Sequence, residues 1–257
     1  MKKILVLGGT GFIGSNVCKK AVKMNFIVHS ISKKKPKSIN RLKKVKYLIA
    51  DLTKKNSLKK YDFNYHYVVN SSGRSFFPKN KQEKINLRNN HYYGMLNLIS
   101  ALNKKTLKRF VHIGSSMEYG LIPGPQYEKN KCKPNNYYGR VKLKCTIYLK
   151  KKFLIEGFPS VVLRVFQVYG PNQQRDKIIP FSALNCKKGK FFKITKGNQL
   201  RDFLYIDDLI DSIFKSLLND KVNGKIINVG YGKPISIRNL VEHIRSIYQK
   251  GKPQFGV

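Results

Sequence analysis

The sequence predicts an α/β fold in which a parallel, doubly wound sheet is followed by a smaller C-terminal region. Three observations support this prediction. Short apolar segments alternate with segments of helical periodicity through most of the chain. A glycine-rich turn follows the first apolar segment, and the alternation weakens after Tyr169-Gly170-Pro171. Strands and helices in this rhythm imply right-handed crossovers, which produce a parallel sheet.

The expected elements follow from periodicity and from the turn residues between them. We expect strands at residues 3–7, 26–31, 45–50, 65–69, 109–113 and 160–165. Helices are expected at residues 12–23, 87–102 and 138–153. In the last third we expect strands at 191–194, 203–205 and 226–229 and helices at 206–218 and 235–248, with Ser236 as a cap. The predicted boundary separates residues 1–170 from a substrate-binding region at residues 171–257.

The formal charge of +39 is the unusual number in the composition, with 52 Lys and Arg residues against 13 Asp and Glu. Such an excess can mark a polyanion partner, such as nucleic acid, an acidic membrane or a phosphorylated substrate. Here the excess is nearly all Lys and is spread along the chain. Nucleic-acid sites use Arg and concentrate charge on one face, so we favour compositional drift and expect no nucleic-acid partner. A diffuse positive field still favours an anionic substrate.

Composition and run lengths argue against several classes of protein. Hydrophobic residues make up 41% of the chain, which suits a globular protein. No apolar run approaches the roughly 20 residues that cross a bilayer, and Gly8 interrupts the N-terminal apolar stretch, so we expect neither a membrane span nor a secretory leader. The four cysteines are scattered without a Cys-x-x-Cys pair, which argues against zinc and disulfides. We therefore expect reduced thiols, no metal and a cytoplasmic location.

Three glycines, Gly8, Gly11 and Gly14, lie between the first predicted strand and the first predicted helix. Gly8 permits the tight turn, Gly11 lets the backbone approach a diphosphate, and Gly14 lets helix and strand pack closely. The helix start, at Phe12 and Ile13, offers unpaired N–H groups and a partial positive charge to the phosphates. A purely structural turn is the alternative, but the strand–turn–helix context favours a dinucleotide site.

Cofactor preference is decided at the end of the second predicted strand, where an acid would hold the ribose 2′-hydroxyl of NAD. Ser32 and Lys33 stand in this neighbourhood, which contains no acid. Because hydroxyls and cations suit a 2′-phosphate, we favour NADP and keep NAD as the alternative. Asp51 and Leu52, after the third strand, could contact the adenine edge, although a strand-ending Asp without this role is the simpler interpretation.

Tyr138 and Lys142 are four residues apart, which puts both on one face of a predicted helix. A phenol with a pKa of about 10 is a poor acid–base group at neutral pH, and a nearby ammonium lowers that pKa. Tyr138 could then exchange a proton while hydride moves to or from the nicotinamide, and Lys142 would also reach the ribose hydroxyls. Ser115 and Ser116 follow the fifth predicted strand, where a hydroxyl can bind the substrate oxygen beside Tyr138. A serine-rich turn without chemistry is the alternative.

Together these motifs resemble the extended short-chain dehydrogenase/reductase family, in its sugar-nucleotide epimerase/dehydratase group. The motifs span nearly the whole chain in the family's order, at residues 8–14, 51–52, 115–120, 138–142, 164–171 and 201–208. The resemblance implies a Rossmann-type domain with a small C-terminal substrate-binding subdomain, a catalytic triad of Ser115, Tyr138 and Lys142, and a homodimer. Ser115 is preferred to Ser116 because the family's hydroxyl lies four residues before the Tyr of Tyr119-Gly120.

On the substrate side, the resemblance implies that Arg201 grips the substrate diphosphate. Gln167 stands where the family often has an Asn near the diphosphate, and Ser116 joins Ser115 in facing the sugar. Relatives usually continue with a further helix beyond Val257, so a short member and an incomplete substrate side are both open.

Departures from the family pattern bear on the type of reaction. The 4,6-dehydratases usually have Thr-Asp-Glu where this chain has Ser115, Ser116 and Met117, and that acidic pair performs the elimination. Glu118 is one place late and would need a local shift to serve. We therefore disfavour a dehydratase.

Other segments favour two related reactions. Residues 196–208 and 230–240 resemble 4-keto-6-deoxysugar reductases of the abequose and paratose type as well as 4-epimerases, whereas His91 replaces a frequent Asn and residues 70–73 replace a more apolar strand end. We expect an NAD(P)-dependent nucleotide-sugar epimerase or 4-ketoreductase that transfers hydride at the sugar 4-position. The alternative from another class is a non-catalytic NAD(P)-sensing or RNA-binding protein on the same fold.

Overall fold

The computed structural model describes residues 1–38 and 41–257, which form two compact units. The first unit contains Met1–Val165 and Leu209–Val229, and the second contains Phe166–Asp208 and Gly230–Val257. The chain therefore leaves the first unit near the predicted boundary, returns to it for about twenty residues, and leaves it again. A single boundary after residue 170 would assign Leu209–Val229 to the C-terminal region, although this segment belongs to the first unit.

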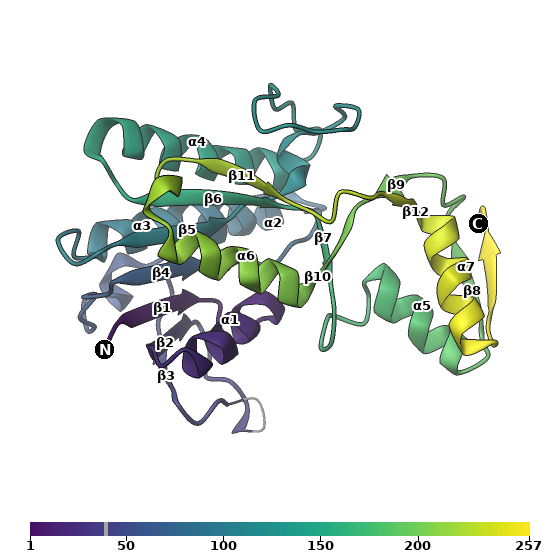
Figure 1. The fold of residues 1–257 in the computed structure, drawn as a ribbon, viewed down its shortest axis with the longest axis horizontal. Helices are drawn as coiled ribbons and strands as arrows, with labels where there is room; N and C mark the ends of the chain where they lie inside the picture. Colours follow the sequence, from purple (N-terminus) through teal and green to yellow (C-terminus); the bar gives the residue numbers. More distant parts are fainter. Residues whose placement is uncertain (39–40) are drawn as a thin grey trace. The chain divides into compact units, whose positions relative to one another are not determined.

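The first unit is built on a seven-stranded sheet in the order β11-β6-β5-β4-β1-β2-β3 (Figure 1). Every neighbouring pair of strands in it is parallel, as the alternation of strands and helices predicts. The strands are β1 Lys3–Leu7, β2 Ile27–Ser32, β3 Val45–Ile49, β4 Tyr67–Asn70, β5 Arg109–Ile113, β6 Ser160–Val165 and β11 Ile226–Val229. The strand order reverses between β1 and β4, and ligands of such sheets bind outside the carboxyl ends of the strands at this point.

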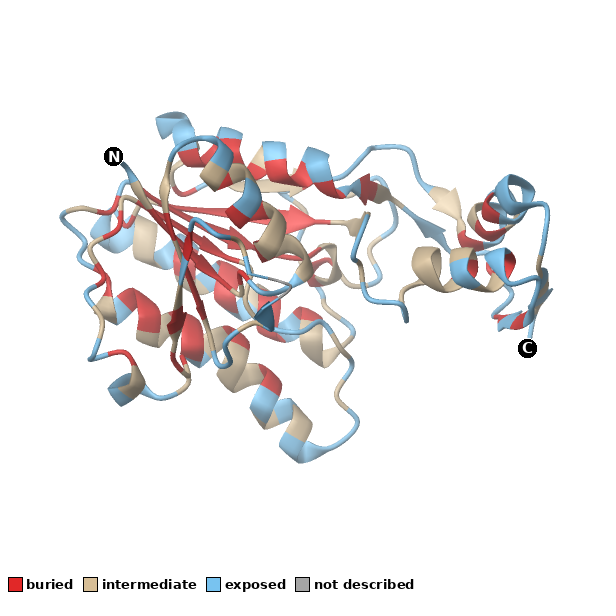
Figure 2. Cartoon of the chain, turned by 90° about the horizontal axis from the view of Figure 1, so that it is seen from below, coloured by how far each residue is buried: buried red, intermediate tan, exposed pale blue. Residues whose placement is uncertain are grey.

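Helices cover both faces of this sheet, and the strands between them are buried (Figures 1 and 2). On one face lie α1 and α6, which contact each other through Lys20 and Asp211, 2.7 Å apart. On the other face Met95, Leu98 and Leu149 pack against strand residues in one apolar core. The helices are α1 Phe12–Lys23, α2 Lys81–Arg88, α3 Gly94–Ala101, α4 Tyr137–Glu156 and α6 Ile206–Leu218. A π-helical segment, Asn89–Tyr93, joins α2 to α3, where the sequence predicts one continuous helix.

The second unit consists of three two-stranded pairings and two helices. The pairings are β7 Gln167–Tyr169 with β10 Phe203–Tyr205, β9 Leu200–Arg201 with β12 Ile235–Ser236, and β8 Phe191–Ile194 with β13 Lys252–Phe255. The helices are α5 Ile178–Lys187 and α7 Ile237–Tyr248, and Ser236 caps α7 by accepting a hydrogen bond from the Asn239 N–H at 3.1 Å. Cys186, Val241 and Ile244 belong to its apolar core. The sequence predicts α7 but gives no signal for α5 or for four of the short strands.

The described residues also bear on membrane spans, metal binding and disulfides. None of their helices is long and apolar enough to cross a membrane. Within residues 1–38 and 41–257, no group of three or more His, Cys, Asp or Glu side chains could hold a metal ion. The thiols of all four cysteines are free, and three of these residues are buried.

Candidate active site

The turn between β1 and α1 is shaped by three backbone features that only glycine allows together. Gly8 has a φ of +73°, in the left-handed region. The Gly11 N–H donates to the Gly8 carbonyl at 2.9 Å, which closes the turn. A Cβ on Gly14 would lie 2.2 Å from the same carbonyl oxygen, so a side chain there would force the turn open.

The start of α1 leaves hydrogen-bond donors for an anion. Gly11 is the N-cap residue and provides no side-chain acceptor, and the first turn of α1 contains no acidic residue. The N–H groups at this end of the helix, including those of Phe12 and Ile13, are therefore suited to phosphate oxygens. This part of the chain fits the diphosphate of a dinucleotide as the sequence predicts.

At the end of β2, the polar side chains predicted to bind the adenosine part of the cofactor make contacts within the chain. The Ser32 hydroxyl donates to the Lys34 carbonyl at 2.8 Å, and the Lys33 ammonium lies 3.3 Å from an Asp51 oxygen. Asp51 also accepts from the N–H and the hydroxyl of Thr53 at 2.9 and 2.7 Å. Burial raises the Asp51 pKa, but the Thr53 hydrogen bonds and the Lys33 charge outweigh it, so the pKa is lowered overall. The next residue, Leu52, is buried.

The three predicted catalytic residues come together at the carboxyl end of β5. Ser115 is buried and caps a short 3₁₀ turn, Ser116–Glu118, in which its hydroxyl accepts from the Met117 N–H at 3.2 Å. Tyr138, on the first turn of α4, has Ser115 as a neighbour close enough to act on the pKa of its hydroxyl. Gly139 permits this approach, because a Cβ there would lie 2.3 Å from the Met117 carbonyl oxygen. The close packing of α4 on the 3₁₀ turn thus makes the two residues neighbours.

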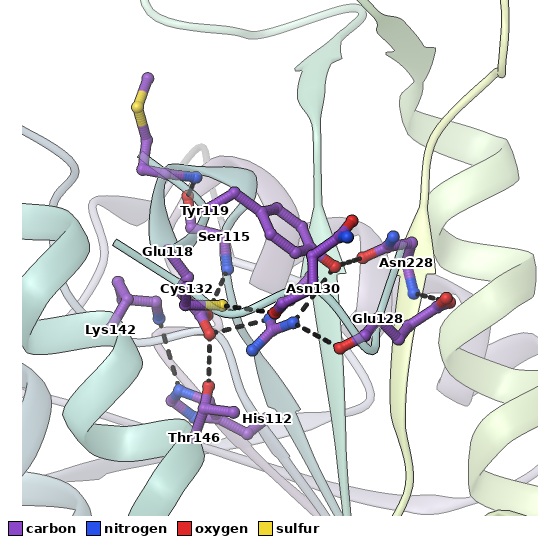
Figure 3. Close-up of polar contacts among 12 residues, drawn as sticks. His112, Ser115, Glu118, Tyr119, Glu128, Asn130, Cys132, Lys142, Thr146 and Asn228 are labelled. Atoms are coloured by element: carbon purple, nitrogen blue, oxygen red, sulfur yellow. Dashed lines mark hydrogen bonds and ion pairs between the residues drawn. The ribbon is translucent and has the colours of Figure 1, made fainter. Parts of the chain in front are cut away.

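Lys142 lies one turn further along α4 and is buried. Figure 3 shows its side chain directed toward His112. Its ammonium donates to the Ile113 carbonyl at the end of β5 and lies 3.4 Å from Nε2 of His112. The other ring nitrogen of His112 is 3.1 Å from the Asn70 amide on β4. Burial lowers the Lys142 pKa, while Cys145 and Glu118 act in the opposite direction. The ammonium therefore links α4 to the sheet beneath the Ser115–Tyr138 pair.

Without a bound cofactor, the pKa of Tyr138 is raised, whereas the sequence predicts that it is lowered. Burial raises it, the Glu118 charge raises it further, and only Ser115 opposes them. The predicted lowering rests on the ammonium of Lys142 and on the nicotinamide, whereas burial and Glu118 act in the opposite direction. Tyr138 is consequently a protonated phenol at neutral pH in the free chain.

His91 contacts Tyr138 from the π-helical segment. The two rings meet edge to face with centroids 5.6 Å apart, and Nε2 of His91 is 3.2 Å from the Arg74 carbonyl oxygen. Its Nδ1 is buried and has no hydrogen-bond partner among the residues described. Burial, with a contribution from the Lys142 charge, lowers the His91 pKa to about 3. Gly73, with a φ of +96°, leaves the room for this ring, since a Cβ there would lie 2.2 Å from it.

Glu118 is the residue whose structural position the sequence analysis misses. Its carboxylate is fully buried and accepts from the Ser115 N–H, the Thr146 hydroxyl and the Arg164 guanidinium. Its spacing from Ser115 matches a capping box, which is the one local signal that could have suggested this inward orientation. No local signal identifies Thr146 or Arg164 as its partners, because they lie on α4 and β6.

The remaining predicted substrate residues are spread over two units. Ser116 is half-buried in the 3₁₀ turn of the first unit. Gln167 and Arg201 belong to the second unit, where the Gln167 N–H donates to the Asp202 carbonyl at 3.0 Å and the Arg201 guanidinium donates to the Leu200 carbonyl at 2.7 Å. Arg201 is exposed. The Asp202 carboxylate accepts from the N–H groups of Tyr231 and Gly232 at 2.8 and 2.7 Å.

Residues 4–230 match the sequence pattern of the NAD dependent epimerase/dehydratase family. The chain belongs to this family. The Rossmann-type fold and the family predicted from the motifs are therefore confirmed, and the chain is a member of a family of NAD-dependent sugar-nucleotide enzymes.

Relatives in this family carry out more than one reaction. The human dTDP-D-glucose 4,6-dehydratase is 25% identical over 261 residues, which cover 95% of this chain and 73% of that protein. The CDP-abequose synthase of Salmonella muenchen is 28% identical over 254 residues, covering 95% of this chain and 80% of that protein. The structure of UDP-glucuronic acid 4-epimerase from Bacillus cereus in complex with UDP-glucuronic acid and NAD has a TM-score of 0.89 and 26% identity, covering 98% of this chain and 85% of that one.

Proposed function

We propose that this chain is a nucleotide-sugar 4-epimerase or 4-ketoreductase that moves hydride at the 4-position of the sugar. The observation that carries the proposal is that Ser115 and Tyr138 are neighbours at the carboxyl end of β5, where α4 packs closely on the 3₁₀ turn, with the Lys142 ammonium beneath them. The pair lies in the same unit as the glycine turn, at the edge of the sheet where ligands of this fold bind.

The side chains present can handle the proton and the oxygen of such a reaction. A bound nicotinamide dinucleotide supplies the hydride acceptor or donor. The Tyr138 hydroxyl exchanges a proton with the 4-oxygen of the sugar, and the Ser115 hydroxyl orients that oxygen. The positive charge of Lys142 favours the phenolate of Tyr138 when the proton leaves, and its fixed position at the Ile113 carbonyl keeps it beneath the pair.

The surroundings of Ser115 argue against a 4,6-dehydratase. Ser116 and Met117 carry no carboxyl group, so neither can act as the acid or base of an elimination. Among the residues that the structure describes, the carboxylate near this pair is that of Glu118, which is fully buried and already accepts three hydrogen bonds. Freeing it would require breaking its ion pair with Arg164.

For the cofactor we favour NADP over NAD. Ser32 ends β2 where an acid would hold the ribose hydroxyls of NAD, and the cation of Lys33 lies next to it. On the substrate side, Ser116 is proposed to face the sugar, and Gln167 and Arg201 to bind the diphosphate. The proposal also includes a homodimer and a cytoplasmic location.

The decisive experiment is a turnover assay of the purified protein and of Tyr138→Phe. NADPH and then NADH are offered with nucleotide-linked 4-keto-6-deoxysugars, and plain nucleotide sugars are tested for interconversion without added cofactor. Sugar-dependent loss of the nicotinamide absorbance identifies a reductase, and interconversion identifies an epimerase. Loss of the Tyr138 proton should lower kcat by about 1000-fold with little change in the Kd of the cofactor.

The neighbouring Tyr137→Phe variant is the matched control, because its ring contacts Arg140 and is no part of the proposed triad. It should keep the activity of the unmodified protein. Full activity of Tyr138→Phe would contradict the assignment. Cofactor binding without turnover in either assay would favour the non-catalytic, cofactor-sensing alternative.

A further inference from the structure

A buried carboxylate lies directly beneath the proposed catalytic pair. One oxygen of Glu118 accepts from the Ser115 N–H at 2.9 Å (Figure 3). The other accepts from the Thr146 hydroxyl at 2.8 Å and from Nε of Arg164 at 3.0 Å. Ser115 follows β5, Thr146 lies on α4 and Arg164 lies on β6, so one side chain connects three elements of the first unit.

Arg164, the counterion of Glu118, is held in place by contacts of its own. The Arg164 guanidinium donates to the Tyr119 hydroxyl at 3.1 Å and lies 4.7 Å from the centre of that ring. The Tyr119 hydroxyl donates to the Asn228 amide oxygen at 2.7 Å, on β11. The side chains of Arg164 and Glu118 are 4% and 0% exposed. A buried ion pair of this kind gives little net stability. Its position beneath the proposed catalytic pair therefore points to a role other than stabilising the fold.

The backbone around Glu118 is matched to the carboxylate. A Cβ on Gly114 would lie 2.8 Å from the Glu118 oxygen that accepts from Ser115, so a larger residue at 114 would displace the carboxylate. Thr146 stands one helical turn after Lys142 on the buried side of α4. The carboxylate therefore holds the backbone of Ser115 on one side and the helix that carries Tyr138 on the other.

We propose that Glu118 is a positioning residue that fixes Ser115 against the Tyr138 helix and maintains a negative charge beneath the catalytic pair. The inference deepens the proposed function and rests on it for its meaning in turnover. It assigns Glu118 neither a substrate contact nor a role as an acid. The carboxylate acts through Ser115 and through the electrostatic field at Tyr138 and Lys142.

The sign of this field follows from the groups that face the pair. A negative charge beneath Tyr138 disfavours its phenolate and favours the ammonium of Lys142, and Glu118 raises the pKa of both. Arg164 compensates Glu118, and removal of the carboxylate would leave that cation unpaired. The other titratable groups that face Tyr138, Lys142 or Glu118 are His91, His112, Cys132 and Cys145. Removing the carboxylate therefore lowers the Tyr138 pKa in two ways, because a negative charge is lost and the positive charge of Arg164 is left unpaired.

The test compares Glu118→Gln with Glu128→Gln. Glutamine at 118 keeps the shape and can still accept from Ser115 and Thr146, but it removes the charge. Glu128 belongs to the same network, with a carboxylate that accepts from the Asn228 N–H at 2.8 Å, but it is exposed. Each variant is titrated by the ultraviolet absorbance of phenolate, and the same variant carrying Tyr138→Phe is subtracted to isolate Tyr138.

The phenolate of Tyr138 should appear about one pH unit lower in Glu118→Gln than in the unmodified protein, and should be unchanged in Glu128→Gln. In any turnover assay that succeeds, the limb of the kcat profile that Tyr138 governs should move to lower pH by a similar amount without a change in KM: the acid limb where Tyr138 takes up the proton, and the alkaline limb where it donates it. The titration requires no turnover, so a protein inactive on every sugar tested would still reveal whether Glu118 controls Tyr138.

If Glu118→Gln does not fold, the double variant Glu118→Gln with Arg164→Met removes the unpaired cation as well and takes its place. The same downward shift of the Tyr138 titration is expected in the double variant. Identical Tyr138 titrations in the Glu118 and Glu128 variants would overturn the proposal. A pH profile that stays fixed while only the yield of folded protein falls would reduce Glu118 to a structural role and would also overturn it.

Discussion

The first unit contains two regions that serve the same proposed site by different physical means. The glycine turn after β1 uses backbone geometry alone, and the contacts that close it, among Gly8, Gly11 and Gly14, span six positions, although the Gly8 N–H also donates to the Ile31 carbonyl. The cluster beneath Tyr138 uses buried charged and polar side chains, and its central pair, Glu118 and Arg164, is 46 positions apart. The comparison shows that the part that fits phosphates is local, whereas the part that sets proton affinity is assembled by the fold.

We expect substitutions in the two regions to have different consequences. The glycine turn contains no titratable side chain, so its alteration should change cofactor affinity and not the pH dependence. The cluster beneath Tyr138 holds the charges of Glu118, Arg164 and Lys142 out of water, so its alteration should change stability and proton affinity before cofactor affinity.

The largest effect on stability is expected for Arg164→Met. The change leaves the Glu118 carboxylate buried without its cation, and we expect the free energy of unfolding to fall by about 3 kcal/mol. Urea denaturation followed by circular dichroism measures the loss. Arg245→Met is the control, because Arg245 pairs with Glu242 at 2.7 Å on the surface and should cost less than about 1 kcal/mol. Equal losses in the two variants would contradict the role assigned to the buried pair.

A comparable effect in the glycine turn is expected for Gly14→Ala. The new Cβ would lie 2.2 Å from the Gly8 carbonyl oxygen, so the turn must open, and the Kd of the cofactor should rise by about 100-fold. Isothermal titration calorimetry with NADPH and NADH measures it and also tests the cofactor preference. Gly124→Ala places its Cβ in open space and should bind as the unmodified protein does. Unchanged cofactor affinity in Gly14→Ala would refute the phosphate role of the turn.

A smaller effect, spread over a range of pH, is expected for His91→Gln. The folded-state pKa of His91 is about 3 against an ordinary 6.5, so between these values the unfolded chain binds the proton more strongly. Stability is therefore lost as pH falls through this window, by about 1.4 kcal/mol per pH unit from this residue. Removing the imidazole should make the acid side of the stability curve shallower. The exposed His243→Gln is the matched control, and an unaltered slope in His91→Gln would show that His91 does not contribute.

Much of the first unit could be predicted because its signals are local. The bounds of β1, α1, β5 and β6 match the apolar periodicity, and the Tyr138–Lys142 spacing identifies one face of α4. The second unit was harder, because β9 and β12 contain two residues each and acquire their structure only by pairing with each other. The π-helical segment that carries His91 also escaped prediction, since its neighbours have ordinary helical periodicity.

The sequence by itself determined the parallel sheet, the glycine turn, the family and the candidates Ser115, Tyr138 and Lys142. These depend on periodicity, on the backbone freedom of glycine and on fixed spacings, all of which are properties of short segments. Only the tertiary structure decided that Glu118 turns inward to Arg164, that His91 lies buried against Tyr138, and that Leu209–Val229 returns to the first unit. The physical reason is that burial and charge pairing depend on which distant segments meet, and both reverse the proton affinity that an isolated Tyr-x-x-x-Lys motif suggests.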